Sequence, residues 1–351
     1  MLKFQKKGLS MLYIHIPFCN SKCYYCAFNS YIDKNYLKKN YFESLKKQFQ
    51  NEQKPNKFSS IFIGGGTPSV MNIDFYEKLF YLLSDYIDKE TEISIEINPN
   101  SLNKEWLQNL KKLGVNRVSF GIQSFNDKKL KFLGRNHSSK EGLKSIEKAK
   151  NIFENINLDL IYSTAIDTET ILNKDLEIAI KLGVQHISAY SLTIEKNTKF
   201  ENYPEKRKEN EELELYFIEK IKEHFFQYEI SNFGKICKHN LGYWQLKEYI
   251  GIGAGAVGYQ NGKRYYTHNL IENYIKNPTF KRVEKLKKSD IVEEKVLLGL
   301  RSIVGFEKEI LNKEQQKRAF ELADEKKIIF KKNRFYSKDF LLADAIALYI
   351  L

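Results

Sequence analysis

The chain has 351 residues, of which 42% are hydrophobic and 14% aromatic, and this composition excludes a disordered or fibrous protein. The formal net charge is +13, from 57 basic and 44 acidic residues. Because the lysines are scattered, we interpret the charge mainly as solvated surface, which favours carboxylated ligands and allows a transient contact with an anionic membrane surface.

Six short apolar or alternating runs are separated by segments with the period of amphipathic helices. The runs are residues 12–16, 60–63, 93–97, 117–122, 156–161 and 186–192. Between the first two, Leu37, Tyr41, Leu45 and Phe49 form one helical stripe. This alternation predicts the α/β class with parallel strands and right-handed crossovers, here an incomplete (β/α)6 TIM-like barrel. In such barrels the chemistry collects at the carboxyl ends of the strands.

The first run leads into a loop with three of the four cysteines, spaced as Cys19-x3-Cys23-x2-Cys26. Three thiolates on one loop can hold three irons of a [4Fe–4S] cluster and leave the fourth iron open to a ligand. A structural zinc site needs four ligands, usually in paired spacing, and a disulfide framework needs an extracellular setting. The apolar run itself is too short for a signal peptide or membrane span, so we expect a cytoplasmic protein.

The spacing CxxxCxxC, with Tyr25 before the last cysteine, resembles the motif of radical S-adenosylmethionine (SAM) enzymes. The string Y-x-H-x-P-F-C over residues 13–19 resembles one branch of them, the oxygen-independent coproporphyrinogen III oxidases and the related HemW-type heme chaperones. This resemblance covers nearly the whole chain. It implies the radical SAM type of partial barrel with a small, mainly helical C-terminal domain. It also implies a [4Fe–4S] cluster and SAM as cofactors, with Tyr13 among the residues that hold SAM.

A glycine-rich loop follows the second run, with the sequence GGGTPS over residues 64–69, and Glu96 lies near the end of the third. Glycines at a strand end let the backbone approach a ligand closely, although a glycine triplet is equally suited to a tight turn. The resemblance implies that Gly65 in this loop holds the methionine part of SAM. It implies that Glu96 contacts the same molecule.

The fourth and fifth runs carry further polar residues near their ends. The resemblance implies contacts with a second SAM molecule from Tyr25, Gly66, Thr67, Gln123, Arg135 and Asp159. Taken alone, Arg135 would also suit the C-terminal end of a helix, where a cation is stabilised by the dipole. After the fifth run the family usually has a Gly-Leu-Pro turn, but this chain has Ser163-Thr164-Ala165. We therefore expect a different backbone path beside this pocket.

A second motif, CKHNLGYW over residues 237–244, matches the HNxxYW string typical of the HemW group. A histidine beside a cysteine and two aromatic residues is a suitable face for a porphyrin and its iron. His239 and Cys237 are therefore candidate heme contacts. The alternative is an ordered turn packed under the barrel mouth, with a hydrogen-bonded structural histidine.

The segment IGIGAGAVG over residues 250–258 lacks the G-x-G-x-x-G spacing of a dinucleotide-binding fingerprint. The resemblance implies instead that this loop, with Val257, closes over the adenosine of SAM. From about residue 277 the strand–helix alternation ends, and residues 328–336 resemble a hairpin. We expect a radical SAM core over residues 1–235, a segment closing the barrel mouth over 236–276, and a small C-terminal domain over 277–351.

Two functions fit these observations: a chaperone that binds heme and transfers it to an acceptor protein, and an oxidase that decarboxylates coproporphyrinogen III. The oxidases usually carry another cysteine two residues past the third cluster cysteine, where this chain has Phe28. They also have an extension ahead of the motif at Tyr13, which here follows only twelve residues. With the HNxxYW string, both features favour the chaperone. The expected partners are heme or a related tetrapyrrole and the acceptor. No nucleic acid is expected, because no RNA-binding module is recognisable.

Overall fold

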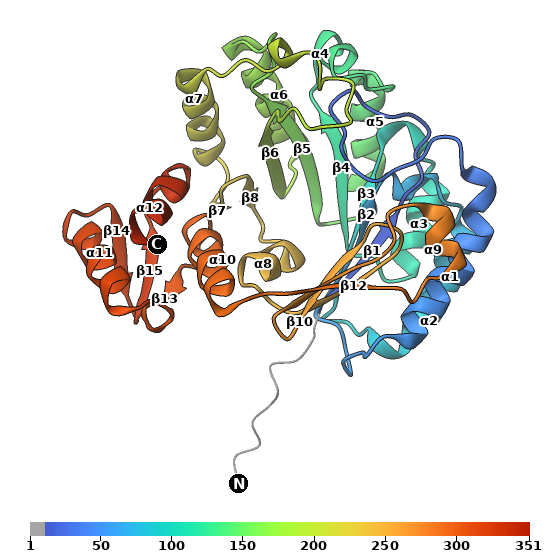
Figure 1. Ribbon diagram of the computed structural model, residues 1–351. Helices are drawn as coiled ribbons and strands as arrows, with labels where there is room; N and C mark the ends of the chain where they lie inside the picture. Colours follow the sequence, from blue (N-terminus) through green and yellow to red (C-terminus); the bar gives the residue numbers. More distant parts are fainter. Residues whose placement is uncertain (1–10) are drawn as a thin grey trace.

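The computed structural model describes residues 11–351, which form one twelve-stranded sheet and a separate three-stranded sheet. The large sheet has the order β12-β11-β10-β9-β1-β2-β3-β4-β5-β6-β8-β7. Its centre is a run of parallel strands that curves into a partial barrel (Figure 1). These strands are β1 (Met11–Ile16), β2 (Ser60–Gly65), β3 (Glu92–Ile97), β4 (Arg117–Gln123), β5 (Ile156–Tyr162) and β6 (His186–Ser191). The predicted incomplete barrel is confirmed.

Crossover helices cover the outer face of these strands. They are α1 (Lys38–Asn51), α2 (Ile73–Leu83), α3 (Lys104–Lys112), α4 (Asp127–Phe132), α5 (Ser139–Lys150), α6 (Glu169–Leu182) and α7 (Glu211–Lys222). The stripe predicted for the first of them is real, since Tyr41, Leu45 and Phe49 are buried in the main core. Most of these helices begin at a side-chain cap, as at Ser138, whose hydroxyl accepts a hydrogen bond from Glu141 N.

Six shorter strands flank the parallel ones and were not predicted from the sequence. They are β7 (Gln227–Glu229), β8 (Asn232–Gly234), β9 (Tyr249–Ile252), β10 (Val257–Gln260), β11 (Lys263–Tyr266) and β12 (Arg282–Lys285). Strand β9 pairs parallel to β1, and β8 pairs antiparallel to β6. Each has only three or four residues, too few for a clear period in the sequence. The large sheet thus continues past residue 277.

Helix α8 (Lys238–Trp244) carries the HNxxYW motif and lies near the lower ends of the parallel strands in Figure 1. Its residues contact Ser60 and Glu92, which are the first residues of β2 and β3. This is the amino end of the parallel strands, whereas the cysteine loop follows their carboxyl end. The motif was expected at the barrel mouth, but in the structure its contacts are with the opposite end. Helix α9 (Ile271–Lys276) packs beside α1.

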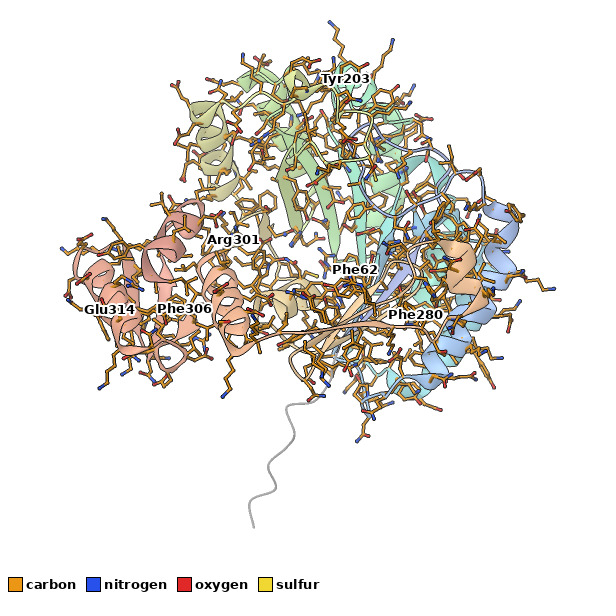
Figure 2. All side chains as sticks on the ribbon, in the orientation of Figure 1. Phe62, Tyr203, Phe280, Arg301, Phe306 and Glu314 are labelled. Atoms are coloured by element: carbon orange, nitrogen blue, oxygen red, sulfur yellow. The ribbon has the colours of Figure 1, made fainter. Side chains whose placement is uncertain are left out.

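The C-terminal unit has its own hydrophobic core, as Figure 2 shows around the labelled Phe306. It contains α10 (Lys288–Leu300), β13 (Phe306–Glu307), α11 (Lys313–Asp324), β14 (Ile328–Lys331), β15 (Arg334–Ser337) and α12 (Ala343–Ile350). The hairpin predicted over residues 328–336 is confirmed by β14 and β15. Throughout residues 11–351, no helix has both the length and the apolar character needed to cross a bilayer.

Candidate functional site

The cysteine loop leaves the end of β1 and returns beside it. Cys19 N donates to Tyr31 O at 2.9 Å, and Tyr31 N donates to Pro17 O at 2.8 Å, so the two arms of the loop are paired. The buried imidazole of His15 completes the closure, with its Nε2 atom 2.8 Å from Asn29 O and its Nδ1 atom 2.9 Å from the hydroxyl of Tyr13. Because burial lowers the pKa of His15, the ring is neutral and can donate at one nitrogen and accept at the other.

The three predicted cluster cysteines all line one cavity at the carboxyl end of the barrel. The hydroxyl of Thr67 lies 3.3 Å from Cys19 Sγ, and the guanidinium of Arg135 lies 3.2 Å from Cys23 Sγ. Burial raises the pKa of both Cys19 and Cys26. Bound iron would reverse that effect, because a coordinating thiol loses its proton.

The donor set fits a cluster better than a single metal ion. Across residues 11–351, no three or more His, Cys, Asp or Glu side chains gather closely enough to hold one ion. The loop therefore does not form the closed four-ligand set of a structural zinc site. Three separate thiols at the edge of a cavity instead suit three corners of a larger cluster.

The glycine-rich loop after β2 packs directly against the cysteine loop. Gly66 N donates to Ile16 O, and Thr67 N donates to Phe18 O, each at 2.8 Å. A Cβ atom at Gly66 would lie 3.0 Å from Cys19 Sγ and closer still to two backbone oxygens. Gly65 has φ +112°, and a Cβ atom there would lie 2.5 Å from the ring of His15. Gly66 is thus required for the close approach of the two loops, and Gly65 is required for its backbone conformation.

Two carboxyl groups face the same cavity from β3 and β5. Glu96 accepts a hydrogen bond from Gly65 N at 3.1 Å, and Asp159 accepts one from Asn157 Nδ2 at 2.7 Å. Burial, with the nearby charge of Asp159, raises the pKa of Glu96 to about 8. Burial also raises the pKa of Asp159. A cationic ligand would restore the ionised forms, and SAM carries both an ammonium and a sulfonium group.

Gln123 is the last residue of β4, and Arg135 follows the end of α4. Arg135 donates to Gly121 O at 2.6 Å and to Asn98 Oδ1 at 3.2 Å, so it is more than a helix-terminal cation on the surface. Gln123 has φ 67° beside an irregularity in the β4–β5 register. This left-handed conformation is uncommon for residues other than glycine, and it occurs here at the cavity wall.

The cavity has a volume of about 410 Å³. It brings together most of the predicted residues: Cys19, Cys23, Tyr25, Cys26, Gly65, Gly66, Thr67, Glu96, Gln123, Arg135, Asp159 and Cys237. Tyr13 is not in the lining, but its ring stacks on the ring of Phe62, which lines the cavity. Val257 also lies outside the lining and pairs with Tyr266 at the start of β10. Its contact with SAM stays a prediction.

The candidate heme contacts lie at the other end of the barrel and are already engaged. His239 Nδ1 is 2.9 Å from Ser60 Oγ, and its Nε2 is 2.9 Å from the hydroxyl of Tyr243. Burial lowers the pKa of His239 to about 3. The thiol of Cys237 donates to Glu92 at 3.3 Å, and burial raises its pKa to about 11. This geometry favours the structural alternative over a heme contact for His239.

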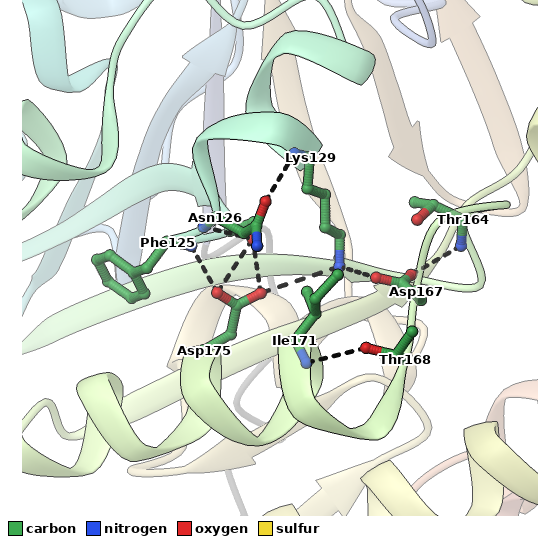
Figure 3. Close-up of polar contacts among 9 residues, drawn as sticks. Phe125, Asn126, Lys129, Thr164, Asp167, Thr168, Ile171 and Asp175 are labelled. Atoms are coloured by element: carbon green, nitrogen blue, oxygen red, sulfur yellow. Dashed lines mark hydrogen bonds and ion pairs between the residues drawn. The ribbon is translucent and has the colours of Figure 1, made fainter.

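The Ser163-Thr164-Ala165 turn keeps a conformation typical of glycine, since Ser163 has φ 62°. Its hydroxyl donates to Glu214 at 2.7 Å, and Thr164 N donates to Asp167 at 2.8 Å. Asp167 in turn forms a buried ion pair with Lys129 of α4 at 2.6 Å (Figure 3). These contacts stabilise the turn that this chain forms without the family's glycine, and a backbone path different from the family's stays a prediction.

Sequence reasoning missed several polar residues deeper in the barrel. Arg117, Ser119, Asn157, Asn232 and Asn240 all line the cavity. A signal was present for the first of them, because Arg117 opens an otherwise apolar strand and is only 2% exposed. Ser119 and Asn157 come from strand interiors and Asn232 from the short strand β8, whereas Asn240 stands in the HNxxYW motif beside the singled-out His239.

Comparison with known proteins identifies the family of the chain. The pattern of the Radical SAM superfamily matches residues 13–174. The heme chaperone HemW of Lactococcus lactis is 38% identical over 310 residues, which cover 84% of this chain and 82% of the relative. HemW of Bacillus subtilis is 36% identical over 319 residues, or 84% of each chain.

Among solved structures, the fold is similar to that of coproporphyrinogen III oxidase (HemN) from Escherichia coli, a radical SAM enzyme. The TM-score is 0.82, with 98% of this chain and 90% of the other covered, at 19% sequence identity. At that identity the likeness shows the fold alone, whereas the HemW relatives are similar in sequence over most of their length. The chain therefore belongs to the HemW family of heme chaperones within the radical SAM superfamily.

Proposed function

We propose that this protein binds heme and transfers it to an acceptor protein, with a [4Fe–4S] cluster and SAM held at the cysteine loop. The observation that carries the proposal is sequence similarity over 84% of the chain to proteins named heme chaperone HemW. A local feature supports it. Phe28 is 64% exposed at the cavity rim, where the oxidases resembled by the motif usually carry a cysteine.

In this proposal Cys19, Cys23 and Cys26 ligate the cluster. When bound, the cluster and SAM supply one-electron chemistry. The protein's own part is to fix the thiolates: Arg135 and the hydroxyl of Thr67 donate to their sulfur atoms and stabilise negative charge there. Glu96 and Asp159 supply carboxylates to a positively charged ligand.

Heme would contact the apolar rim of the same cavity. Phe28 and Tyr190 both line the cavity and are 64% and 43% exposed. Large exposed aromatic side chains suit a flat apolar macrocycle, because stacking removes apolar area from water on both surfaces. His239 is not needed as a ligand in this arrangement.

A paired experiment tests the proposal against the oxidase alternative. Cluster-loaded protein is titrated anaerobically with heme, and the heme complex is then mixed with excess apomyoglobin as a heme acceptor. In parallel, the protein is incubated with SAM, a strong reductant and coproporphyrinogen III. We expect saturable heme binding, transfer of heme to apomyoglobin, and no decarboxylated porphyrin. Several turnovers of protoporphyrinogen formation, or absence of heme binding, would overturn the proposal.

A further inference from the structure

Arg117 is a buried cation that makes no ion-pair contact with a carboxylate. It begins β4, is 2% exposed, and lines the cavity at the end opposite the cysteine loop. Its Nε atom has no hydrogen-bond partner. Within the described residues, it takes part in none of the ion pairs. An unpaired buried charge is costly, so a partner for the guanidinium is expected.

The two carboxyl groups whose charge raises the pKa of Arg117, Glu92 and Asp159, are hydrogen-bonded to other groups. Glu92 accepts hydrogen bonds from Lys238 N at 2.9 Å and from His239 N at 3.1 Å, at the start of α8. Asp159 accepts from Asn157 at 2.7 Å. Both act on Arg117 through their charge, without an ion-pair contact. The guanidinium therefore keeps donors that face the cavity.

The other cations of the cavity lining are not available for this role. Lys22 is exposed at the rim. Arg135 already donates to Cys23, Gly121 and Asn98 at the cluster end. His186 is outside the lining, is hydrogen-bonded at both ring nitrogens, to Asn157 and Tyr228, and is neutral because burial lowers its pKa. Arg117 is thus the one charge in this lining that can meet an anion at the amino end.

The chemistry of the surroundings selects the anion. A guanidinium binds planar carboxylates with two parallel hydrogen bonds. A doubly charged phosphate would be repelled more strongly by Glu92 and Asp159 than a singly charged carboxylate. The neighbouring Ser119, Asn232 and Asn240 give this end of the cavity a polar lining. We propose that Arg117 binds a propionate carboxylate of the tetrapyrrole inside the barrel. The inference rests on the heme-binding function proposed above.

The test compares heme with heme dimethyl ester, in which both propionates are neutral. Each is titrated into the full-length, cluster-loaded protein, and dissociation constants are measured by quenching of protein fluorescence. We expect the wild type to bind heme at least about tenfold more tightly than the ester, as for a charge-assisted pair. Arg117→Gln should weaken heme binding to the level of the ester and leave ester binding unchanged. Arg117→Lys keeps the charge but loses the two parallel donors of the guanidinium, so its affinity for heme should lie between those of the wild type and Arg117→Gln.

Controls distinguish a failure of this inference from misfolding of the variant and from a failure of the proposed heme binding. Arg282→Gln removes an exposed arginine of β12, outside the cavity, and should leave the preference for heme unchanged. The wild-type comparison needs no variant, so equal affinity for heme and ester overturns the inference while heme binding stands. If neither compound binds, both the heme-binding proposal and the inference about Arg117 are overturned. A folded Arg117→Gln protein that still prefers heme overturns the role of Arg117 alone.

Discussion

At the scale of single residues, the four cysteines divide into two kinds. All four line the cavity, but Cys19, Cys23 and Cys26 belong to the cysteine loop, whereas Cys237 donates to Glu92 at the opposite end of the barrel. We expect replacement of any one of the first three by alanine to abolish the visible absorbance of the reconstituted cluster. Cys237→Ala is the matched control and should keep it. Equal loss of absorbance in all four variants would contradict this assignment.

Glu96 makes stability depend on pH in the protein without cofactors. Its pKa is raised to about 8, so the folded state binds a proton that the unfolded state releases at lower pH. This group therefore contributes less stability as pH rises from about 4.5 toward 8. Glu96→Gln should show a stability advantage over the wild type that grows across this window, by on the order of 1 kcal/mol or more.

Thermal denaturation of cofactor-free protein at several pH values measures that advantage. Glu147→Gln, on the exposed face of α5, is the control and should show no such trend. SAM should bind more weakly to Glu96→Gln than to the wild type, because the variant lacks the carboxylate. An advantage of Glu96→Gln that is constant with pH would show that this carboxyl does not titrate in the window.

His239 is predicted to act through the fold. Its ring bridges Ser60 and Tyr243, so His239→Ala leaves the buried hydroxyl of Ser60 and the half-buried hydroxyl of Tyr243 without this partner. We expect a loss of about 2 kcal/mol in the free energy of unfolding by urea, since each unsatisfied buried group costs about 1–3 kcal/mol. Heme affinity should stay within about twofold of the wild type. A larger loss of heme affinity in a folded variant would restore the heme-contact hypothesis.

These residues show what the sequence could predict about the site. Cys19, Gly66 and Glu96 stand in spaced motifs at strand ends, and the barrel brings strand ends together, so their convergence followed from the pattern. His239 stands in an equally clear motif, but its motif does not tell which end of the barrel the helix faces. That depends on contacts with Ser60 and Glu92, far away in the chain.

At the scale of elements, one buried network joins two loops that border the site. Lys129 of α4 is 0% exposed, lies 2.6 Å from Asp167 and 3.9 Å from Asp175, and so links α4, the turn after β5 and α6 (Figure 3). Asp175 also accepts a hydrogen bond from Phe125 N, two residues after Gln123. The network thereby connects the Ser163 turn with the strand end that carries Gln123.

Lys129→Met should disrupt this network. The change leaves two buried carboxylates without their cation, and breaking such a pair costs about 3–5 kcal/mol in the free energy of unfolding. Lys131→Met, on the exposed side of the same helix, should cost less than about 0.5 kcal/mol. Urea denaturation measures both. If Asp167→Asn is added to Lys129→Met, part of the loss should be recovered, and strictly additive effects would argue against the pair.

Short elements were the part of the fold that the sequence did not reveal. Strands β7 and β8 have three residues each and no readable alternation, yet they continue the sheet beyond β6. The long parallel strands were predictable because both faces are buried, which gives continuous apolar runs. The short strands are specified by their neighbours instead, as where β8 pairs with His186–Ser188 of β6.

At the scale of the whole molecule, two cores are joined by a few contacts. Ile230 N donates to Arg301 O and Ile303 N donates to Tyr228 O, each at 2.9 Å, which ties the C-terminal unit to the β7–β8 edge of the barrel. Strand β12 belongs to the large sheet, and the second core begins in α10. The division of the chain at residues 235 and 277 stays a prediction.

The net charge of +13 leads to a prediction about heme capture. Heme carries two propionates, so a positively charged protein should accelerate its association, and salt should screen that attraction beyond a Debye length of about 8–10 Å near physiological ionic strength. We expect the association rate constant to fall several-fold between about 0.02 and 0.3 M salt, while the dissociation rate constant changes little. Stopped-flow fluorescence measures both. Heme dimethyl ester is the control, since it lacks the negative charges and should associate at a rate independent of salt. An equal salt effect on both compounds would mean that salt changes the protein and not its attraction for the propionates. In that case the lysines would be only a solvated surface.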